Sequence, residues 1–79
     1  MRKSVHTRAY TVLRKGLVAA RQDAGLSQAK LARKLGRPQS FVAKYEGGER
    51  RVDLVELFEI AAALDIDPRP IIQAMLKAL

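Results

Sequence analysis

The strongest constraint on the fold is a short segment enclosed by two glycines, Gly25 and Gly36. Glycine is typical of the left-handed position that follows the end of a helix. Ser27, just inside the first glycine, is of the type that caps a helix N-terminus. Apolar residues recur between them at helical spacing, namely Leu31, Ala32 and Leu35. The segment therefore predicts a short helix that begins after Ser27, buries one stripe and ends at Gly36.

Similar signals divide the rest of the chain. Five helices are expected, and each begins near a residue that caps a helix or fits its first turn. These residues are Thr7, Ser27, Pro38, Asp53 and Pro68. No stretch alternates apolar and polar residues for long enough to predict a strand. The expected fold is all-α, a five-helix bundle in a single domain over residues 7–79. Residues 1–6 have little to pack and are predicted to be a flexible basic arm.

Helical periodicity also predicts which faces are buried. In the first helix the expected buried positions are Tyr10, Leu13, Leu17, Ala20 and Ala24. In the fourth helix they are Leu54, Leu57, Ile60, Ala61 and Leu64, with Glu56 and Glu59 on the solvent side.

Charge is distributed unevenly along the chain, which has 79 residues and a formal net charge of +7. Residues 1–51 contain 13 Lys and Arg against three acids, whereas residues 52–79 contain two against five. This asymmetry indicates a face that binds a polyanion and a separate packing or partner face. Cysteine is absent, and the longest apolar runs, about five residues, are far shorter than the ~20 that a membrane span needs. We therefore expect a cytoplasmic protein with no membrane segment.

The second and third predicted helices meet at a tight glycine turn, which is typical of a helix-turn-helix. In the third helix Val42 and Tyr45 are expected to be buried, and Gln39, Ser40 and Lys44 to protrude. Short polar side chains on a protruding helix suit the base edges of the DNA major groove, and a glutamine can pair with adenine through two hydrogen bonds.

The stretch "GLSQAKLARKLGRPQSFVAKYEGGERR" resembles the Cro/repressor (Xre-type) helix-turn-helix family. The resemblance rests on "GLSQ" before the second helix, the "LA" and "LG" pairs within it, "QS" at the start of the third helix, and the "EGGE" that follows. It covers roughly Leu13 to Ile66. It implies a lambda-repressor-like DNA-binding fold and a regulator that recognises double-stranded DNA by sequence, expected to repress transcription as a homodimer on a near-palindromic operator, associated with the nucleoid.

The resemblance also implies roles for individual residues. It assigns base reading to Gln39, Ser40 and Lys44, and phosphate contacts to Gln28, Arg37, Arg50 and Arg51. It pairs Arg21 with Glu46 in a structural ion pair, the alternative being two independent surface charges. Phe41 stands at the border of the polar face. It is expected either to touch a thymine methyl group or to pack against the turn or the loop after Gly48.

The last predicted helix, residues 68–78, is too apolar for one small core. Its apolar residues are Ile71, Ile72, Met75, Leu76 and Leu79. Such a surface is typical of an interface, and we expect it to join two copies of the chain. Two alternatives remain open: an antitoxin whose apolar helix binds a toxin, or a restriction–modification controller protein. We expect no catalytic residue, metal site or cofactor, since the sequence shows no nucleophile motif and only one histidine, His6.

Overall fold

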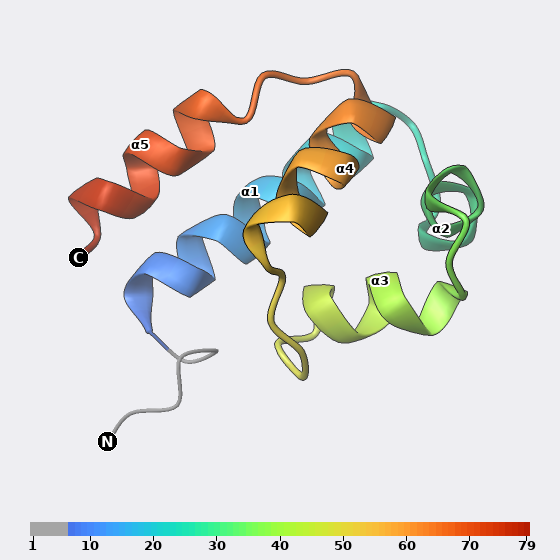
Figure 1. Cartoon of the computed structure of the whole chain (residues 1–79), viewed down its shortest axis with the longest axis horizontal. Helices are drawn as coiled ribbons and strands as arrows, with labels where there is room; N and C mark the ends of the chain where they lie inside the picture. The colour runs from blue at the N-terminus through green and yellow to red at the C-terminus, as the bar shows by residue number, and fades with distance from the viewer. Residues whose placement is uncertain (1–6) are drawn as a thin grey trace.

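The computed structural model describes residues 7–79, which form five α-helices joined by short loops (Figure 1). In chain order they are α1 (Arg8–Asp23), α2 (Gln28–Leu35), α3 (Gln39–Glu46), α4 (Leu54–Leu64) and α5 (Arg69–Lys77). No strand occurs in this part of the chain, and the all-α prediction is confirmed. Within the same residues, none of the helices has the length and apolar character needed to cross a bilayer. The basic arm predicted over residues 1–6 lies outside the described residues.

The helix ends lie where their capping residues predict. The side chains of Thr7, Ser27 and Asp53 each accept a backbone N–H from the first turn of the helix that follows. Such bonds satisfy donors that have no partner within the helix. Gly36 ends α2 with a φ of 67°, a left-handed conformation that a side chain would strain.

The core forms where the helices cross. α1 packs against α3 and α5, and α2 packs against α3 and α4. The largest fully buried side chains are Leu17, Leu31, Val42, Tyr45 and Ile60. Every helix from α1 to α4 contributes to this set, so α3 is fixed to the body of the molecule along one edge.

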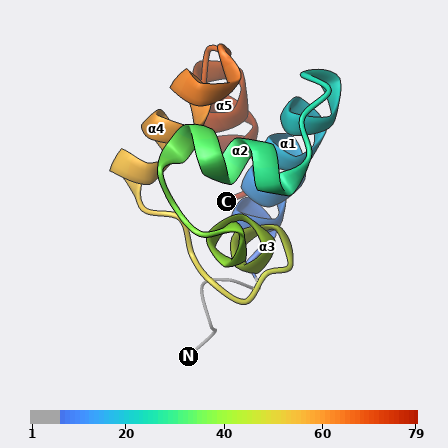
Figure 2. The same ribbon diagram turned by 90° about the vertical axis from the view of Figure 1, so that its right-hand side faces the viewer.

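α3 and α5 lie on different sides of the molecule. In both views α3 lies towards the lower side and α5 towards the upper side (Figures 1 and 2). The chain therefore offers two separate surfaces, one around α3 and one around α5.

Three burial predictions were wrong. Glu56 was expected to face solvent but is only 6% exposed, whereas Leu54 was expected to be buried and is 62% exposed. Ala24 is exposed because it is the C-cap of α1, where the chain already leaves the core. Glu56 can be buried because basic side chains and a backbone N–H satisfy its carboxylate, which periodicity does not reveal. Leu54 begins α4 and lines an open groove beside α5.

Candidate nucleic-acid interface

α3 has one buried edge and one exposed face. Val42 and Tyr45 are both fully buried, and they fix the helix against the core. Gln39, Ser40 and Lys44 are exposed, so the three residues predicted to read bases lie together on the outer side. α3 is short and follows α2 after only a few residues, as a helix-turn-helix requires.

The C-terminal end of α3 is held by the carboxylate of Glu46. Arg21 donates from Nε to Oε2 at 2.7 Å and from Nη2 to Oε1 at 3.0 Å. The side chains of Arg21 and Glu46 are 12% and 6% exposed, and this contact raises the pKa of Arg21. From α1, Arg14 Nη1 also donates to the Glu46 carbonyl oxygen at 3.0 Å. Arg21 and Glu46 thus form the ion pair that the resemblance implied, and it joins α1 to the end of α3.

Gln28, assigned to phosphate, also contacts Glu46. Its Nε2 donates to Glu46 Oε1 at 2.8 Å, which ties the first residue of α2 to the last of α3. A side-chain amide carries two N–H donors, so this bond leaves a second one for a phosphate. The backbone N–H of Gln28 lies in the first turn of α2, where helices bind anions.

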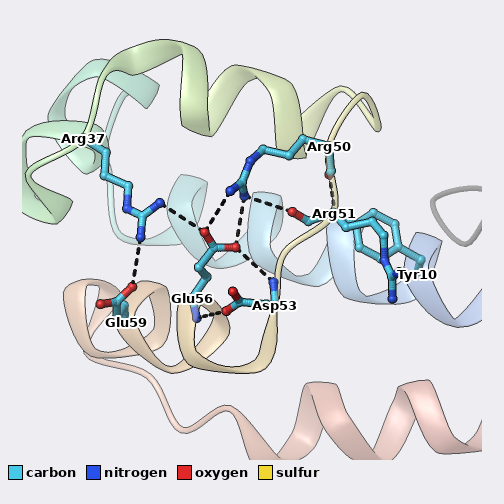
Figure 3. A network of polar contacts seen from close by, with 7 residues as sticks. All are labelled: Tyr10, Arg37, Arg50, Arg51, Asp53, Glu56 and Glu59. Carbon is cyan, nitrogen blue, oxygen red and sulfur yellow. Dashed lines mark hydrogen bonds and ion pairs between the residues drawn. The ribbon is translucent and has the colours of Figure 1, made fainter.

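A second polar network lies at the other edge of α3, around the carboxylate of Glu56 (Figure 3). Arg50 donates from Nη1 to Oε1 at 3.0 Å and from Nη2 to Oε2 at 2.9 Å. Arg37 donates from Nη1 to Glu56 Oε2 at 3.1 Å and from Nη2 to Glu59 Oε1 at 3.4 Å. Two residues assigned to phosphate contacts therefore have carboxylate partners within the protein.

Phe41 packs under these two arginines. The guanidinium carbons of Arg37 and Arg50 lie 4.4 and 4.7 Å from its ring centroid, within the range of cation–π attraction. The ring also meets Tyr45 edge-on, with centroids 5.4 Å apart. Because Phe41 is only 8% exposed, its contacts favour the packing interpretation over a contact with thymine.

Glu56 also belongs to the cap of α4. Its Oε1 accepts the backbone N–H of Asp53 at 3.0 Å, and its own N–H donates to Asp53 Oδ1 at 2.7 Å. The bonds from Arg50, with the Asp53 N–H and the charge of Arg37, lower the pKa of Glu56 to about 2. Glu56 is therefore a carboxylate at any physiological pH.

The loop between α3 and α4 is fixed to α1. Tyr10 Oη donates to the carbonyl oxygen of Arg50 at 2.6 Å, and burial raises the pKa of this tyrosine. Arg51, the next residue, is exposed. The loop thus presents Arg51 beside the end of α3 and turns Arg50 inward.

Sequence reasoning missed two features of the molecule. The first is Glu56, although the spacing of Asp53 and Glu56 is that of a capping box and marks the glutamate as more than a surface charge. The second is the apolar outer side of α4, where Leu54, Val55 and Phe58 are 62%, 65% and 48% exposed. The sequence could have predicted this apolar side, since Val55 and Phe58 do not fit the predicted buried face of the fourth helix.

An apolar groove separates α4 from α5. It has a volume of about 210 Å³ and is lined by Ala9, Leu54, Leu57, Ile72, Met75, Leu76 and Leu79. Four of the five residues predicted to form a dimer interface thus line one groove. The fifth, Ile71, faces α1, where a Cβ on Gly16 would lie 3.2 Å from its Cγ1.

The fold and the α3 face define a helix-turn-helix DNA-binding protein. The helix-turn-helix family model matches residues 17–71, and the chain belongs to this family in its Cro/C1-type, or XRE, form. It is a DNA-binding transcriptional regulator. No curated protein matches the sequence significantly.

Solved structures support the same assignment. An XRE-family like protein from Pseudomonas syringae pv. tomato is 39% identical over 87% of this chain and 84% of its own, with a TM-score of 0.81. The restriction-modification controller protein C.AhdI from Aeromonas hydrophila is 39% identical over 78% of this chain and 94% of its own, with a TM-score of 0.71. A variant of the controller protein C.Esp1396I shares the fold at 21% identity, with a TM-score of 0.69 over 98% of this chain and 92% of its own.

Proposed function

We propose that this regulator binds a near-palindromic DNA operator as a homodimer and represses transcription by occupying it in the cytoplasm. The observation that carries the proposal is the outer face of α3, where Gln39, Ser40 and Lys44 are exposed while the opposite edge is fully buried. A helix fixed in this way enters the major groove with short polar side chains foremost.

Phosphate contacts would surround this face. Arg51 is exposed in the loop after α3, and Gln28 begins α2. Contacts of this kind set the position of the protein on DNA and carry no sequence information directly. The positive net charge of +7 supports the same mode of binding.

The groove between α4 and α5 supports a homodimer. Leu76 and Leu79 are 63% and 88% exposed, and Leu54 of α4, which is 62% exposed, lines the same groove. A second copy related by two-fold symmetry would cover this surface and place two α3 helices on the same DNA. Half-sites about one helical turn apart, ~34 Å, would then form the operator.

Selection of bound sequences from a random double-stranded DNA pool tests this function. We expect an enriched near-palindrome whose two halves are centred about one helical turn apart. A promoter that carries the enriched site should then give less transcript when the protein is added. Failure to enrich any sequence over the starting pool would refute sequence-specific binding, and a rise in transcript would refute repression.

A second candidate is control of a restriction–modification system. It is favoured by the likeness to the controller protein C.AhdI, at 39% identity over 94% of that chain. Mapping the enriched operator on the source genome separates the candidates. Sites next to restriction and modification genes would support the controller function, and sites elsewhere would reject it.

A further inference from the structure

Residues that flank α3 on either side bind the same carboxylate. Arg37 lies just before α3 and Arg50 lies shortly after it, and both guanidinium groups bind Glu56 of α4. Phe41, within α3, lies under both of them. The position of the helix relative to α4 therefore depends on one acidic side chain that is not part of α3.

The same contacts pair two positive charges with a carboxylate while leaving them partly exposed to solvent. Arg37 and Arg50 have side chains that are 35% and 38% exposed, whereas that of Glu56 is 8% exposed. With Glu59, which pairs with Arg37, the cluster contains two cations and two anions. It is thus neutral within a chain of net charge +7, although it borders the face that meets DNA.

We propose that Glu56 is a specificity-determining residue, which uses Arg37 and Arg50 to position α3 and withholds their charge from DNA phosphates. This inference rests on the proposed function. Glu56 is suited to the role because the backbone N–H of Asp53 holds its carboxylate in place at 3.0 Å. Charge-assisted bonds to a fixed carboxylate are strong and directional, so the arginines stay with Glu56 when a mobile phosphate approaches.

Loss of this carboxylate has two consequences. The released guanidinium groups become available to the phosphates of any sequence, which raises affinity for random DNA. The position of α3 becomes less defined, which lowers affinity for the operator. Both changes reduce the ratio of operator affinity to random-DNA affinity.

The test compares Glu56→Gln with Glu59→Gln. Both remove one negative charge, but Glu59 is half-exposed and its contact with Arg37 is the longer one, at 3.4 Å. Glutamine at position 56 retains an oxygen that accepts the Asp53 N–H, which preserves the cap. Binding to the selected operator and to a scrambled duplex is measured by fluorescence anisotropy over a range of salt concentrations, and circular dichroism verifies the fold.

For Glu56→Gln we expect the affinity ratio to fall on the order of tenfold. We also expect the salt slope on scrambled DNA to steepen by about 0.9 for each arginine released per protomer. Glu59→Gln should change the ratio by less than about threefold. In a double variant, Glu56→Gln with Arg50→Gln, part of the increase in the salt slope should disappear, because one of the released arginines is gone. A general loosening of the fold would not give this partial reversal.

The single variant Arg50→Gln tests the inference even if Glu56→Gln does not fold. In this variant Arg37 remains bound to Glu56, so that carboxylate keeps a partner. We expect the salt slope on scrambled DNA to remain that of the wild type, whereas Arg51→Gln should reduce it by about 0.9 per protomer. The inference is overturned if Arg50→Gln reduces the slope as Arg51→Gln does, or if folded Glu56→Gln behaves like Glu59→Gln. Absence of operator preference in the wild type would instead refute the proposed function.

Discussion

At the scale of single residues, two buried glutamates fix the position of α3. Glu46 ends α3 and binds Arg21 of α1, while Glu56 of α4 binds arginines on either side of α3. A buried carboxylate is costly unless it is paired and hydrogen-bonded, and both glutamates are. Each therefore stabilises the fold only as long as its partners are present.

The Arg21–Glu46 pair leads to the first prediction. Glu46→Gln should lower the free energy of unfolding by about 3 kcal/mol, because the nearly buried guanidinium of Arg21 loses its counter-charge. The free-energy difference between binding to the operator and binding to random DNA should change by less than the free energy of unfolding does. Urea denaturation measures the effect, with Glu49→Gln as the control, since Glu49 is exposed and loses the same charge. Equal stability of the two variants would contradict a structural role.

Glu56 leads to a prediction about pH. Folding lowers the pKa of the Glu56 carboxyl to about 2, from about 4.3 in the unfolded chain. The ionised carboxylate therefore stabilises the protein fully above about pH 4.3, and this stabilisation is lost as the pH falls towards 2. The difference in unfolding free energy between wild type and Glu56→Gln should therefore shrink by about 2 kcal/mol from pH 6 to pH 2. This value is reduced from about 3 kcal/mol because the arginine partners are partly exposed to solvent. A difference that stays constant over this range would show that Glu56 is not specially stabilised.

Tyr45 gives the third prediction. Its side chain is fully buried, its hydroxyl has no hydrogen-bond partner among the described residues, and burial raises its pKa. Since an unsatisfied buried hydroxyl is costly, Tyr45→Phe should raise the free energy of unfolding by about 1 kcal/mol. Thermal denaturation measures it, and Tyr10→Phe is the control because it removes the bond to the Arg50 carbonyl and should destabilise. A lower stability for Tyr45→Phe would mean that the hydroxyl has a partner in solution.

At the scale of elements, α3 combines a structural edge and a reading face in only eight residues. No side chain caps its first turn, and Pro38 stands at the N-cap. Its position is therefore set by contacts with its neighbours, namely Val42 and Tyr45 in the core and the arginines at its ends. The loop that follows determines which arginine faces outward.

This division of roles predicts different effects for two alanine variants. Gln39→Ala should cost about 1–3 kcal/mol per half-site on the operator and relax preference at one base pair, because it removes a base contact. Arg51→Ala should weaken operator and random DNA alike and reduce the salt slope by about 1 per protomer. Binding titrations on both duplexes measure this. If the two variants affect both DNAs equally, the assigned roles are wrong.

At the scale of the whole molecule, α3 lies towards the lower side and α5 towards the upper side (Figure 2), and the apolar groove is lined largely by residues of α4 and α5. One face can therefore bind DNA while the other binds a second copy. The uneven charge along the sequence agrees with this division, because the basic residues 1–51 include α3 and the rest includes α4 and α5.

The proposed homodimer leads to the fifth prediction. Leu76→Glu places a charge in the groove and should convert the proposed dimer to a monomer that binds the full operator at least tenfold more weakly. Gln73→Glu adds the same charge to an exposed position of α5 that does not line the groove, and should leave the dimer intact. Sedimentation velocity at tens of micromolar protein measures both. A wild type that is monomeric with and without DNA would exclude the homodimer.

The sequence by itself determined the elements and the family. Capping residues and glycines fixed the helix ends, since they act on local backbone groups, and the apolar spacing marked Val42 and Tyr45 as buried. What only the tertiary structure decided was the partner of each charge. Arg50 and Arg51 are adjacent in the sequence, yet one turns to Glu56 and the other to solvent. The orientation of a long charged side chain depends on carboxylates of other elements, such as Glu56 of α4, which come near only when the loop and the helices pack.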